Sequence, residues 1–355
     1  MKKILSILIV AGMLMSLLSG CSLDSSSKPS DSASAGMQTE NTSTEKVATE
    51  EKVFRLGVNG GGSSGLLMEI AGLAYKNGYL EEELNNIGYR LEVTAMFGGP
   101  VINEALASGK LDAAIYGDFP AFTSKSNGID TTVIANLNSA FQSGVLVVND
   151  EIKEPKDLEG KRVIVQLGTS LQYFWEKYAK YYGIDTDKVE VINVSTDANA
   201  LLTSGQADAY ISSVYGVKYM ESLGVGTVMG DGSEVTDGAS TFVFEISTEL
   251  LNAEPQVGIA VNKALIRAYN DAVSDPQKLY EAVSSEYMTP EIMAYQYAFD
   301  TSLSYMYPEI TDELITYYAS LNEWLYDHSY ITEKVDINSY FDNSYFEKAA
   351  EELGR

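Results

Sequence analysis

The chain contains the same thirteen-residue phrase twice, and this repetition constrains its fold more than any other feature. The first copy runs from Asn103 to Ile115, and the second runs from Asn199 to Ile211, 96 positions later. Seven of the thirteen positions are identical. Each copy predicts a helix that ends at a glycine, followed by an aspartate and a short apolar strand, because glycine readily adopts the left-handed conformation found after a helix C-cap.

The likeness of the two copies extends to the segments around them. We predict a strand at residues 54–58, followed by a Gly/Ser-rich loop and a helix, and a second strand at 162–166, followed by residues 168–170 and another helix. Each repeated phrase also leads into a polar loop after its own strand. The sequence therefore predicts two similar α/β halves with two candidate site loops each, and a chance likeness between small α/β units is the alternative.

Residues 1–20 are typical of a bacterial lipoprotein signal peptide. Lys2 and Lys3 precede an apolar run at 4–18, which is short for a membrane span and suits the apolar region of a signal. The run leads into Leu-Ser-Gly-Cys21, which looks like a lipobox and contains the only cysteine of the chain. We predict cleavage before Cys21 and lipidation of its thiol (palmitate included), which would anchor the protein on the extracytoplasmic face of a bacterial cell membrane. An uncleaved signal anchor is the alternative.

Composition restricts the partners and the chemistry. Residues 21–52 are rich in Ser, Thr and charged side chains and contain no aromatic residue, so we interpret them as a disordered tether. The chain has a formal charge of −26 and an isoelectric point of about 4.3. An acidic surface argues against nucleic acid as a partner, because phosphate groups are bound by clustered Lys and Arg. A lipidated Cys21 would leave no thiol for a disulfide or for cysteine catalysis.

The glycine-rich loop after the first strand has three possible interpretations. Residues 60–65 match G-x-G-x-x-G between a strand and a helix, which is the dinucleotide-binding fingerprint. A lone match is weak evidence, and an exported lipoprotein has no supply of such a cofactor. A second interpretation is an anion site at a helix N-terminus, where free amide groups would bind the ligand at Gly61, Gly62, Ser63 and Ser64. A tight turn without a ligand is the third.

Three further loops carry candidate ligand residues. Gly117 and Asp118 follow the strand of the first repeat, and Asp118 is either a helix N-cap or a carboxylate that faces a ligand. Gly168, Thr169 and Ser170 precede an aromatic-rich helix that Thr169 and Ser170 can cap. The third loop follows the strand of the second repeat and contributes Ser213 and Tyr215.

Catalysis is disfavoured by the distribution of reactive side chains. His328 is the only histidine and lies in a C-terminal region of helical pattern, where we interpret it as a surface residue. We recognise no metal-ligand spacing and no Ser-His-Asp arrangement around it. We therefore expect a non-enzymatic protein without a metal or other cofactor, and we expect the helices after residue 254 to pack on the outside of the first half.

Two segments carry a family resemblance. The stretch 99–120, which includes the first repeat, and the block 156–170, which contains Lys-Asp-Leu-Glu-Gly-Lys-Arg-Val and Gly-Thr-Ser, are the most specific parts. The order of these motifs is similar to that in the aliphatic sulfonate, taurine and nitrate substrate-binding proteins of ABC importers, a group that includes binders of thiamine-precursor pyrimidines. Residues 213–216 depart from the Trp-Asp-Pro-like stretch of many sulfonate binders, which leaves the ligand open.

The resemblance implies an α/β protein with the two-lobed type II periplasmic-binding-protein fold and a hinge between the lobes. Residues 53–142 and 241–355 would form lobe 1, with the C-terminal helices, and residues 143–240 would form lobe 2. The family's ligand contacts would fall on 61–64, 117–118, 169–170, 213 and 215. The implied function is capture of a small anionic or zwitterionic solute by lobe closure and delivery, as a monomer, to an ABC permease and ATPase. A ligand-sensing surface receptor of the same fold, or a binder of nitrate or a thiamine-precursor pyrimidine, is the alternative.

The carboxylate of Asp118 bears on the choice of ligand. If it is ionised and faces the ligand, it would repel a simple anion and attract an amine. On that reasoning the sequence favours a zwitterion similar to taurine.

Overall fold

The computed structural model describes residues 52–355, with the exception of 60–66, 97, 142, 195–196, 231, 233, 236–239, 287 and 298–299. The predicted signal peptide, Cys21, the tether and the loop residues Gly61, Gly62, Ser63 and Ser64 lie outside the described residues. No helix within the described ranges is both long and apolar enough to cross a membrane.

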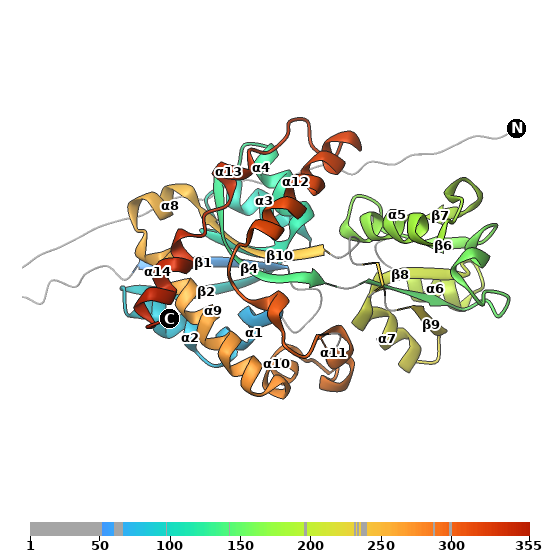
Figure 1. Ribbon diagram of the computed structural model, residues 1–355, viewed down its shortest axis with the longest axis horizontal. Coiled ribbons are helices and arrows are strands. Elements are labelled where there is room, and N and C mark those ends of the chain that lie inside the picture. The colour runs from blue at the N-terminus through green and yellow to red at the C-terminus, as the bar shows by residue number, and fades with distance from the viewer. Residues whose placement is uncertain are drawn as a thin grey trace, which may run out of the picture. The chain divides into compact units, whose positions relative to one another are not determined.

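Two five-stranded sheets organise the chain (Figure 1). The first sheet has the order β2-β1-β3-β10-β4, and its strands are β1 (Lys52–Asn59), β2 (Tyr89–Met96), β3 (Ala113–Gly117), β4 (Thr131–Phe141) and β10 (Ser240–Ser247). The second has the order β7-β6-β8-β5-β9, and its strands are β5 (Ser143–Val147), β6 (Arg162–Ile164), β7 (Glu190–Ile192), β8 (Ala209–Ser213) and β9 (Thr227–Gly230). The chain thus passes between the sheets twice, after β4 and after β9.

The two sheets share one topology. In each, the fourth strand of the order runs antiparallel to both of its neighbours: β10 pairs with β3 and β4, and β5 pairs with β8 and β9. The other pairs, β1 with β2 and β3, and β6 with β7 and β8, are parallel. The antiparallel strand is in each case the first strand after a passage from the other sheet. This correspondence confirms the two similar α/β halves predicted from the repeat.

The repeated phrase ends its helix in the same way in both halves. α3 (Gly99–Ala107) is followed by Gly109 at φ +67°, and α6 (Ala198–Thr203) by Gly205 at φ +68°. The amide of Lys110 donates a hydrogen bond to the carbonyl of Ala105 at 2.9 Å. The amide of Gly109 donates to the carbonyl of Leu106, and the two bonds together form a Schellman motif. The corresponding bonds recur in the second copy. The glycine stops predicted from sequence are therefore confirmed.

The aspartate of each repeat pairs with an arginine on the neighbouring parallel strand, which is β1 in the first sheet and β6 in the second. Asp112 accepts hydrogen bonds from the amide and the Nε of Arg55, both at 2.8 Å. Asp208 accepts the same two bonds from Arg162, both at 2.9 Å. The acid thereby fastens the strand of the repeat, β3 or β8, to the neighbouring parallel strand, β1 or β6. These pairs explain why each copy carries an aspartate at this position.

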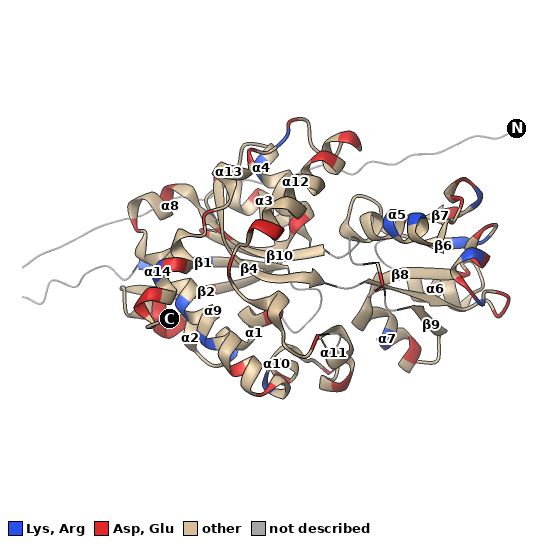
Figure 2. Cartoon of the chain, viewed as in Figure 1, with Lys and Arg blue, Asp and Glu red and all other residues tan. Residues whose placement is uncertain are grey.

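Helices cover both faces of each sheet, which is the usual way to bury a largely parallel sheet. On one face of the first sheet, β1 joins a core with α1 (Glu69–Lys76) and α9 (Gln256–Ser274) through Phe54, Leu56 and Val58. On the other face, Tyr116 of β3 joins a core with α4 (Asp118–Ser126) and α12 (Asp312–Asp327). In the second sheet, Val145 faces α5 (Ser170–Tyr182), and Leu146 faces α6 and α7 (Val214–Ser222). The strands carry few charged residues. Charged residues of both signs gather in the connections near β6 and β7 (Figure 2).

The helices have the following bounds: α1 (Glu69–Lys76), α2 (Tyr79–Asn85), α3 (Gly99–Ala107), α4 (Asp118–Ser126), α5 (Ser170–Tyr182), α6 (Ala198–Thr203), α7 (Val214–Ser222), α8 (Thr248–Ala253), α9 (Gln256–Ser274), α10 (Pro276–Val283), α11 (Pro290–Tyr297), α12 (Asp312–Asp327), α13 (Ile337–Tyr340) and α14 (Ser344–Glu352). Short 3-10 helices are η1 (Pro155–Leu158), η2 (Thr186–Lys188) and η4 (Ser304–Met306). The buried face of α9 contributes to the core of the first sheet.

Candidate functional site

Three of the predicted site loops lie at the carboxyl ends of strands. Gly117 ends β3 and precedes α4, residues 168–170 follow β6 and lead into α5, and Ser213 ends β8 and precedes α7. Ligands of open α/β sheets bind outside the carboxyl ends of the strands. The amide groups at the first turn of a helix also favour an anion there. The loops therefore have the position and polarity of an anion site.

Thr169 caps α5, as its residue type predicts. Its Oγ1 accepts a hydrogen bond from the Leu171 amide at 3.2 Å and donates one to the Gln166 carbonyl at 2.7 Å. Gly168 has φ +74°, where a side chain would be strained, and its amide donates to Oε1 of Gln172 at 2.9 Å. Within the described part of the chain, the amide and the hydroxyl of Ser170 have no hydrogen-bond partner. Ser170 is therefore the group at this helix start that could donate to a ligand.

Ser213 caps α7 in the second lobe. Its Oγ accepts a hydrogen bond from the Gly216 amide at 3.2 Å. Tyr215 lies one residue into α7, and its amide donates to Oε1 of Gln296 in α11 at 3.4 Å. The Tyr215 ring also packs against the core of the first lobe. Tyr215 thus reaches from the second half of the chain to the first.

Asp118 is buried and already occupied by protein donors. Its side chain is 1% exposed, and Oδ2 accepts hydrogen bonds from the Thr241 amide at 2.9 Å and from the Tyr317 hydroxyl at 2.6 Å. Oδ1 accepts from the Phe119 amide at 2.8 Å. Burial raises the pKa of Asp118, and these donors oppose that rise. Gly117, rather than Asp118, is the N-cap of α4, and an amine would have to displace Tyr317 to reach the carboxylate. A ligand role for Asp118 stays a prediction.

Side chains next to the predicted loops meet between the two halves. Phe119, which follows Asp118, contacts Tyr173 of α5 with ring centroids 6.2 Å apart at 65°. Trp324 of α12 contacts both rings, at 5.5 Å from Phe119 and 5.3 Å from Tyr173. The β3–α4 and β6–α5 loops are thus brought near each other by an aromatic cluster, although they are about fifty residues apart in the sequence.

The end of α12 and the residues just after it make contacts that the sequence did not predict. The Nε1 of Trp324 donates to Glu176 of α5 at 2.9 Å, and the Tyr330 hydroxyl donates to Gln172 at 2.5 Å. The Nε2 of His328 lies 3.4 Å from a Glu176 oxygen. These C-terminal residues therefore contact the second lobe as well as the first, and His328 is part of that contact. In the sequence these residues occupy ordinary positions of a helical pattern, which does not indicate a contact with the second lobe.

A buried carboxyl group near Tyr215 was also missed. Glu69 is the first residue of α1 and is 0% exposed, and its Oε2 accepts a hydrogen bond from the Asn138 amide group at 2.8 Å. Burial raises the pKa of Tyr215, and the negative charge of Glu69 adds to the rise, which places the two side chains close together. From sequence, Glu69 resembles any acidic residue in the first turn of a helix, and its burial depends on segments far away in the chain.

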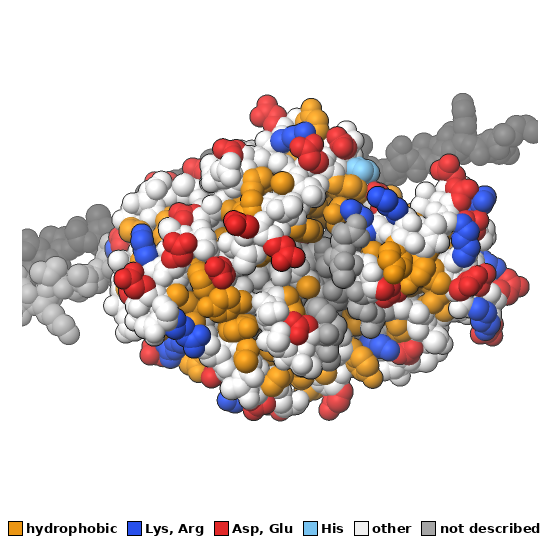
Figure 3. Space-filling view, in the orientation of Figure 1, with side chains coloured by type: hydrophobic (Ala, Val, Ile, Leu, Met, Phe, Trp, Pro, Cys, Tyr) orange, Lys and Arg blue, Asp and Glu red, His pale blue; other side chains and the backbone are white. Residues whose placement is uncertain are grey.

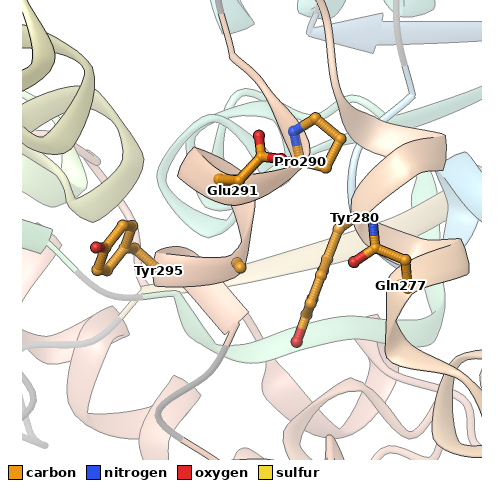
Figure 4. A pocket seen from close by; sticks show the side chains of 6 residues that line it. Gln277, Tyr280, Pro290, Glu291 and Tyr295 are labelled. Carbon is orange, nitrogen blue, oxygen red and sulfur yellow. The ribbon is translucent and has the colours of Figure 1, made fainter.

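Two surface pockets lie away from the predicted loops. One, of about 380 Å³, is formed by α10 and α11 and is lined by Gln277, Tyr280, Pro290, Glu291, Ala294 and Tyr295 (Figure 4). The other, of about 390 Å³, lies at β5 and β9. Neither contains a predicted ligand residue. In the described ranges no group of three or more His, Cys, Asp or Glu residues could hold a metal ion.

Comparison with known proteins identifies the family. The family model described as "NMT1/THI5 like" matches residues 73–279. The taurine-binding periplasmic protein of Escherichia coli (strain K12) is 28% identical over 187 residues, which cover 50% of this chain but only 56% of that protein. A Bacillus subtilis (strain 168) protein assigned to binding aliphatic sulfonates is 22% identical over 295 residues, which cover 79% of this chain and 84% of that protein.

A solved structure supports the same fold. The protein from Methylobacillus flagellatus KT that is assigned as the periplasmic sulfonate-binding protein of a sulfonate ABC transporter superposes with a TM-score of 0.75 at 22% identity. The match covers 85% of this chain and 95% of that one. At this sequence identity the structural likeness shows a shared fold and nothing further. The shared fold agrees with the two-lobed α/β architecture built from the two sheets. The family match spans more than half of the residues, and the chain therefore belongs to the NMT1/THI5-like family.

Proposed function

We propose that this protein is an extracytoplasmic solute-binding protein that captures a small sulfonate, anionic or zwitterionic, and delivers it to the permease and ATPase of an ABC importer. The observation that carries the proposal is the likeness to proteins named for binding taurine and aliphatic sulfonates, which in the Bacillus subtilis case extends over 79% of this chain. The likeness to the taurine-binding protein points to the same class of solute.

The chemistry of the loops supports a sulfonate. Gly117, Gly168, Thr169, Ser170 and Ser213 stand at helix starts and include no Lys or Arg, and Ser170 has an amide and a hydroxyl without a partner among the described residues. A sulfonate would be held there by hydrogen bonds and helix dipoles, and each charge-assisted bond contributes roughly 1.5–3 kcal/mol. Tyr215 would add a contact from the second lobe. Closure of the lobes on the solute would be a hinge motion.

The location of the protein follows from its N-terminal sequence. The lipobox-like stretch that ends at Cys21 supports export, removal of residues 1–20 and attachment by a lipid. The acidic composition suits a protein held in water outside the membrane (Figure 3 shows acidic side chains spread over one face). We propose that it works as a lipid-anchored monomer. Labelling of growing cells with a palmitate analogue, compared between the native chain and Cys21→Ala, tests the anchor: label that survives the substitution contradicts it.

A thermal-shift screen tests the function. The purified protein is unfolded, freed of bound solute, refolded and heated with taurine, alkanesulfonates, nitrate, bicarbonate, amino acids and thiamine-pathway pyrimidines. A solute present at a hundred times its dissociation constant should stabilise the fold by about 2.7 kcal/mol. We expect stabilisation by one or more sulfonates. Stabilisation by another class alone, or by no compound, would contradict the proposal.

A matched pair of variants tests the place of the sulfonate. Ser170→Glu puts a negative charge at the first residue of α5, where it suits the helix dipole but repels an anion. Ser344→Glu makes the same change at the first residue of α14 and is the control. We expect Ser170→Glu to abolish the thermal shift by a sulfonate and Ser344→Glu to preserve it. An equal response of both variants would exclude the start of α5 as the sulfonate site.

A further inference from the structure

Glu69 has an unusual backbone conformation for a helix-forming acid. It has φ +61°, in the left-handed region that side chains other than glycine rarely adopt. Such a conformation is unfavourable and persists only where the surroundings enforce it, often at ligand sites. α1 begins at this residue, after the loop that follows β1. The positive φ of Glu69 is therefore consistent with a role for its side chain in a ligand site.

The carboxyl group of Glu69 is buried and incompletely paired. Oε2 accepts a hydrogen bond from Asn138 at 2.8 Å, whereas Oε1 has no hydrogen-bond partner among the described residues. The hydroxyl of Tyr297 in α11, itself fully buried, lies beside Glu69 and lowers the pKa of its carboxyl group, although no hydrogen bond of standard geometry joins that hydroxyl to a described residue. Desolvation raises the pKa of Glu69 to about 8, although the Asn138 and Tyr297 side chains act to lower it. A buried carboxyl group with a free oxygen is costly unless a donor or a cation joins it.

The groups that face Glu69 come from both lobes, and none of them is a cation. Asn138 belongs to β4, Tyr297 to α11, Tyr305 to η4 and Tyr215 to α7 of the second lobe. Burial raises the pKa of all three tyrosines, and the negative charge of an ionised Glu69 adds to the rise. No Lys, Arg or His contributes to the pKa of Glu69. Among the described residues, the carboxylate therefore has no cationic partner.

We propose that Glu69 accepts the ammonium group of a zwitterionic sulfonate whose sulfonate is bound at the start of α5. This inference rests on the proposed function and specifies its solute class as an aminoalkanesulfonate. An ammonium carries three donors, and Oε1 of Glu69, which has no hydrogen bond of standard geometry among the described residues, is an acceptor for one of them. Glu69 thus takes the role that the sequence gave to Asp118, whose oxygens are already bonded to Thr241 and Tyr317.

Proton linkage gives the proposal a measurable signature. Glu69 is mostly protonated at pH 7 in the free protein, because its pKa is about 8. An ammonium ligand requires the ionised form, so binding of taurine should release close to one proton and should strengthen about 20-fold between pH 6 and pH 7.5. 1-Propanesulfonate has a methyl group in place of the ammonium. It should release no proton, and its binding should not strengthen as pH rises.

The test is isothermal titration of the purified protein with taurine and with 1-propanesulfonate, in two buffers of different ionisation enthalpy. Glu69→Gln keeps the shape of the side chain and removes its charge. The control is Glu245→Gln, since Glu245 is also 0% exposed but both of its oxygens accept hydrogen bonds, from Tyr116, Thr131 and Tyr340. We expect Glu69→Gln to weaken taurine at least tenfold, to change 1-propanesulfonate less than twofold and to abolish proton release. We expect Glu245→Gln to leave the ratio of the two affinities unchanged.

The outcomes distinguish a failure of the role proposed for Glu69 from a failure of the proposed function. If the native protein binds both sulfonates and Glu69→Gln weakens them equally or not at all, the role of Glu69 is refuted and the proposed function stands. The same holds if 1-propanesulfonate binds and taurine does not. If neither sulfonate binds, the proposed function fails and the inference fails with it. Retained binding of 1-propanesulfonate by Glu69→Gln also shows that the variant is folded.

Discussion

The buried carboxyl group of Glu69 predicts an unusual dependence of stability on pH. Its pKa is 4.5 in an unfolded chain and about 8 in the folded protein. Because the folded pKa is raised, the folded state holds a proton that the unfolded state releases, and stability is lost as pH rises from about 4.5 towards 8. Each unit of pKa difference corresponds to about 1.36 kcal/mol.

Glu69→Gln removes this penalty, since the amide carries no charge at any of these pH values. Between pH 5 and pH 7.5, ionisation at position 69 lowers the free energy of unfolding of the native protein by about 3 kcal/mol and does not change that of the variant. Other titrating groups contribute equally to both proteins and cancel in the difference. We therefore expect the variant to gain about 3 kcal/mol in the free energy of unfolding, relative to the native protein, over this interval.

Urea unfolding of ligand-free protein, followed by circular dichroism at pH 5, 6, 7 and 7.5, measures this difference. The slope of free energy against urea must match between the two proteins at each pH, so that the comparison concerns stability alone. The expected result is a pair of stability profiles that diverge steadily as pH rises. Parallel profiles would show that Glu69 ionises normally, and the argument from its burial would be wrong.

Three further substitutions test contacts that position the loops. Arg162 lowers the pKa of Asp208 to about 2, so the stability that the ionised Asp208 contributes is present above pH 4 and is lost as pH falls towards 2. Asp208→Asn should therefore lower the free energy of unfolding by about 2 kcal/mol at pH 7 and by little at pH 2. An equal loss at both pH values would contradict the pairing. Gly168→Ala should cost about 1–2 kcal/mol in urea unfolding, because Gly168 has φ +74° and a Cβ there would lie 3.3 Å from the Tyr330 ring; unchanged stability would refute the strain. Trp324→Phe removes the indole donor to α5 and should cost about 1 kcal/mol in the same assay, whereas no change would show that the bond is not formed in solution.

The internal repeat predicted the architecture well because it encodes local structure. The glycines at 109 and 205 end their helices in left-handed conformations, and the topology of the two sheets corresponds strand for strand. The aspartates at 112 and 208 were recognised as part of the phrase, but their arginine partners were not. That pairing depends on which strand lies beside the strand of the repeat in each sheet, and a repeat in one segment carries no information about a strand 46 or 57 residues earlier.

The site was harder to predict because its important side chains are defined by distant contacts. Asp118 was chosen as the ligand carboxylate on its position after a strand, and the structure surrounds it with Thr241 and Tyr317, which are 123 and 199 residues away. Glu69 was overlooked because a first-turn acid usually faces water. Only the packing of α7, α11 and η4 around it reveals that it is buried. Thr169, by contrast, was predicted as a cap, because capping is decided within three residues.

The most direct test of the account is a crystal structure of the protein with a bound sulfonate, since the central claim is that the strand-to-helix loops hold that group. Crystals grown with taurine, and a second set grown with 1-propanesulfonate, should show the sulfonate within hydrogen-bond distance of the amide and hydroxyl of Ser170 in α5, with Ser213 and Tyr215 on its second-lobe side. A sulfonate bound instead in the pocket between α10 and α11, or none bound near α5 at saturating concentration, would contradict the account.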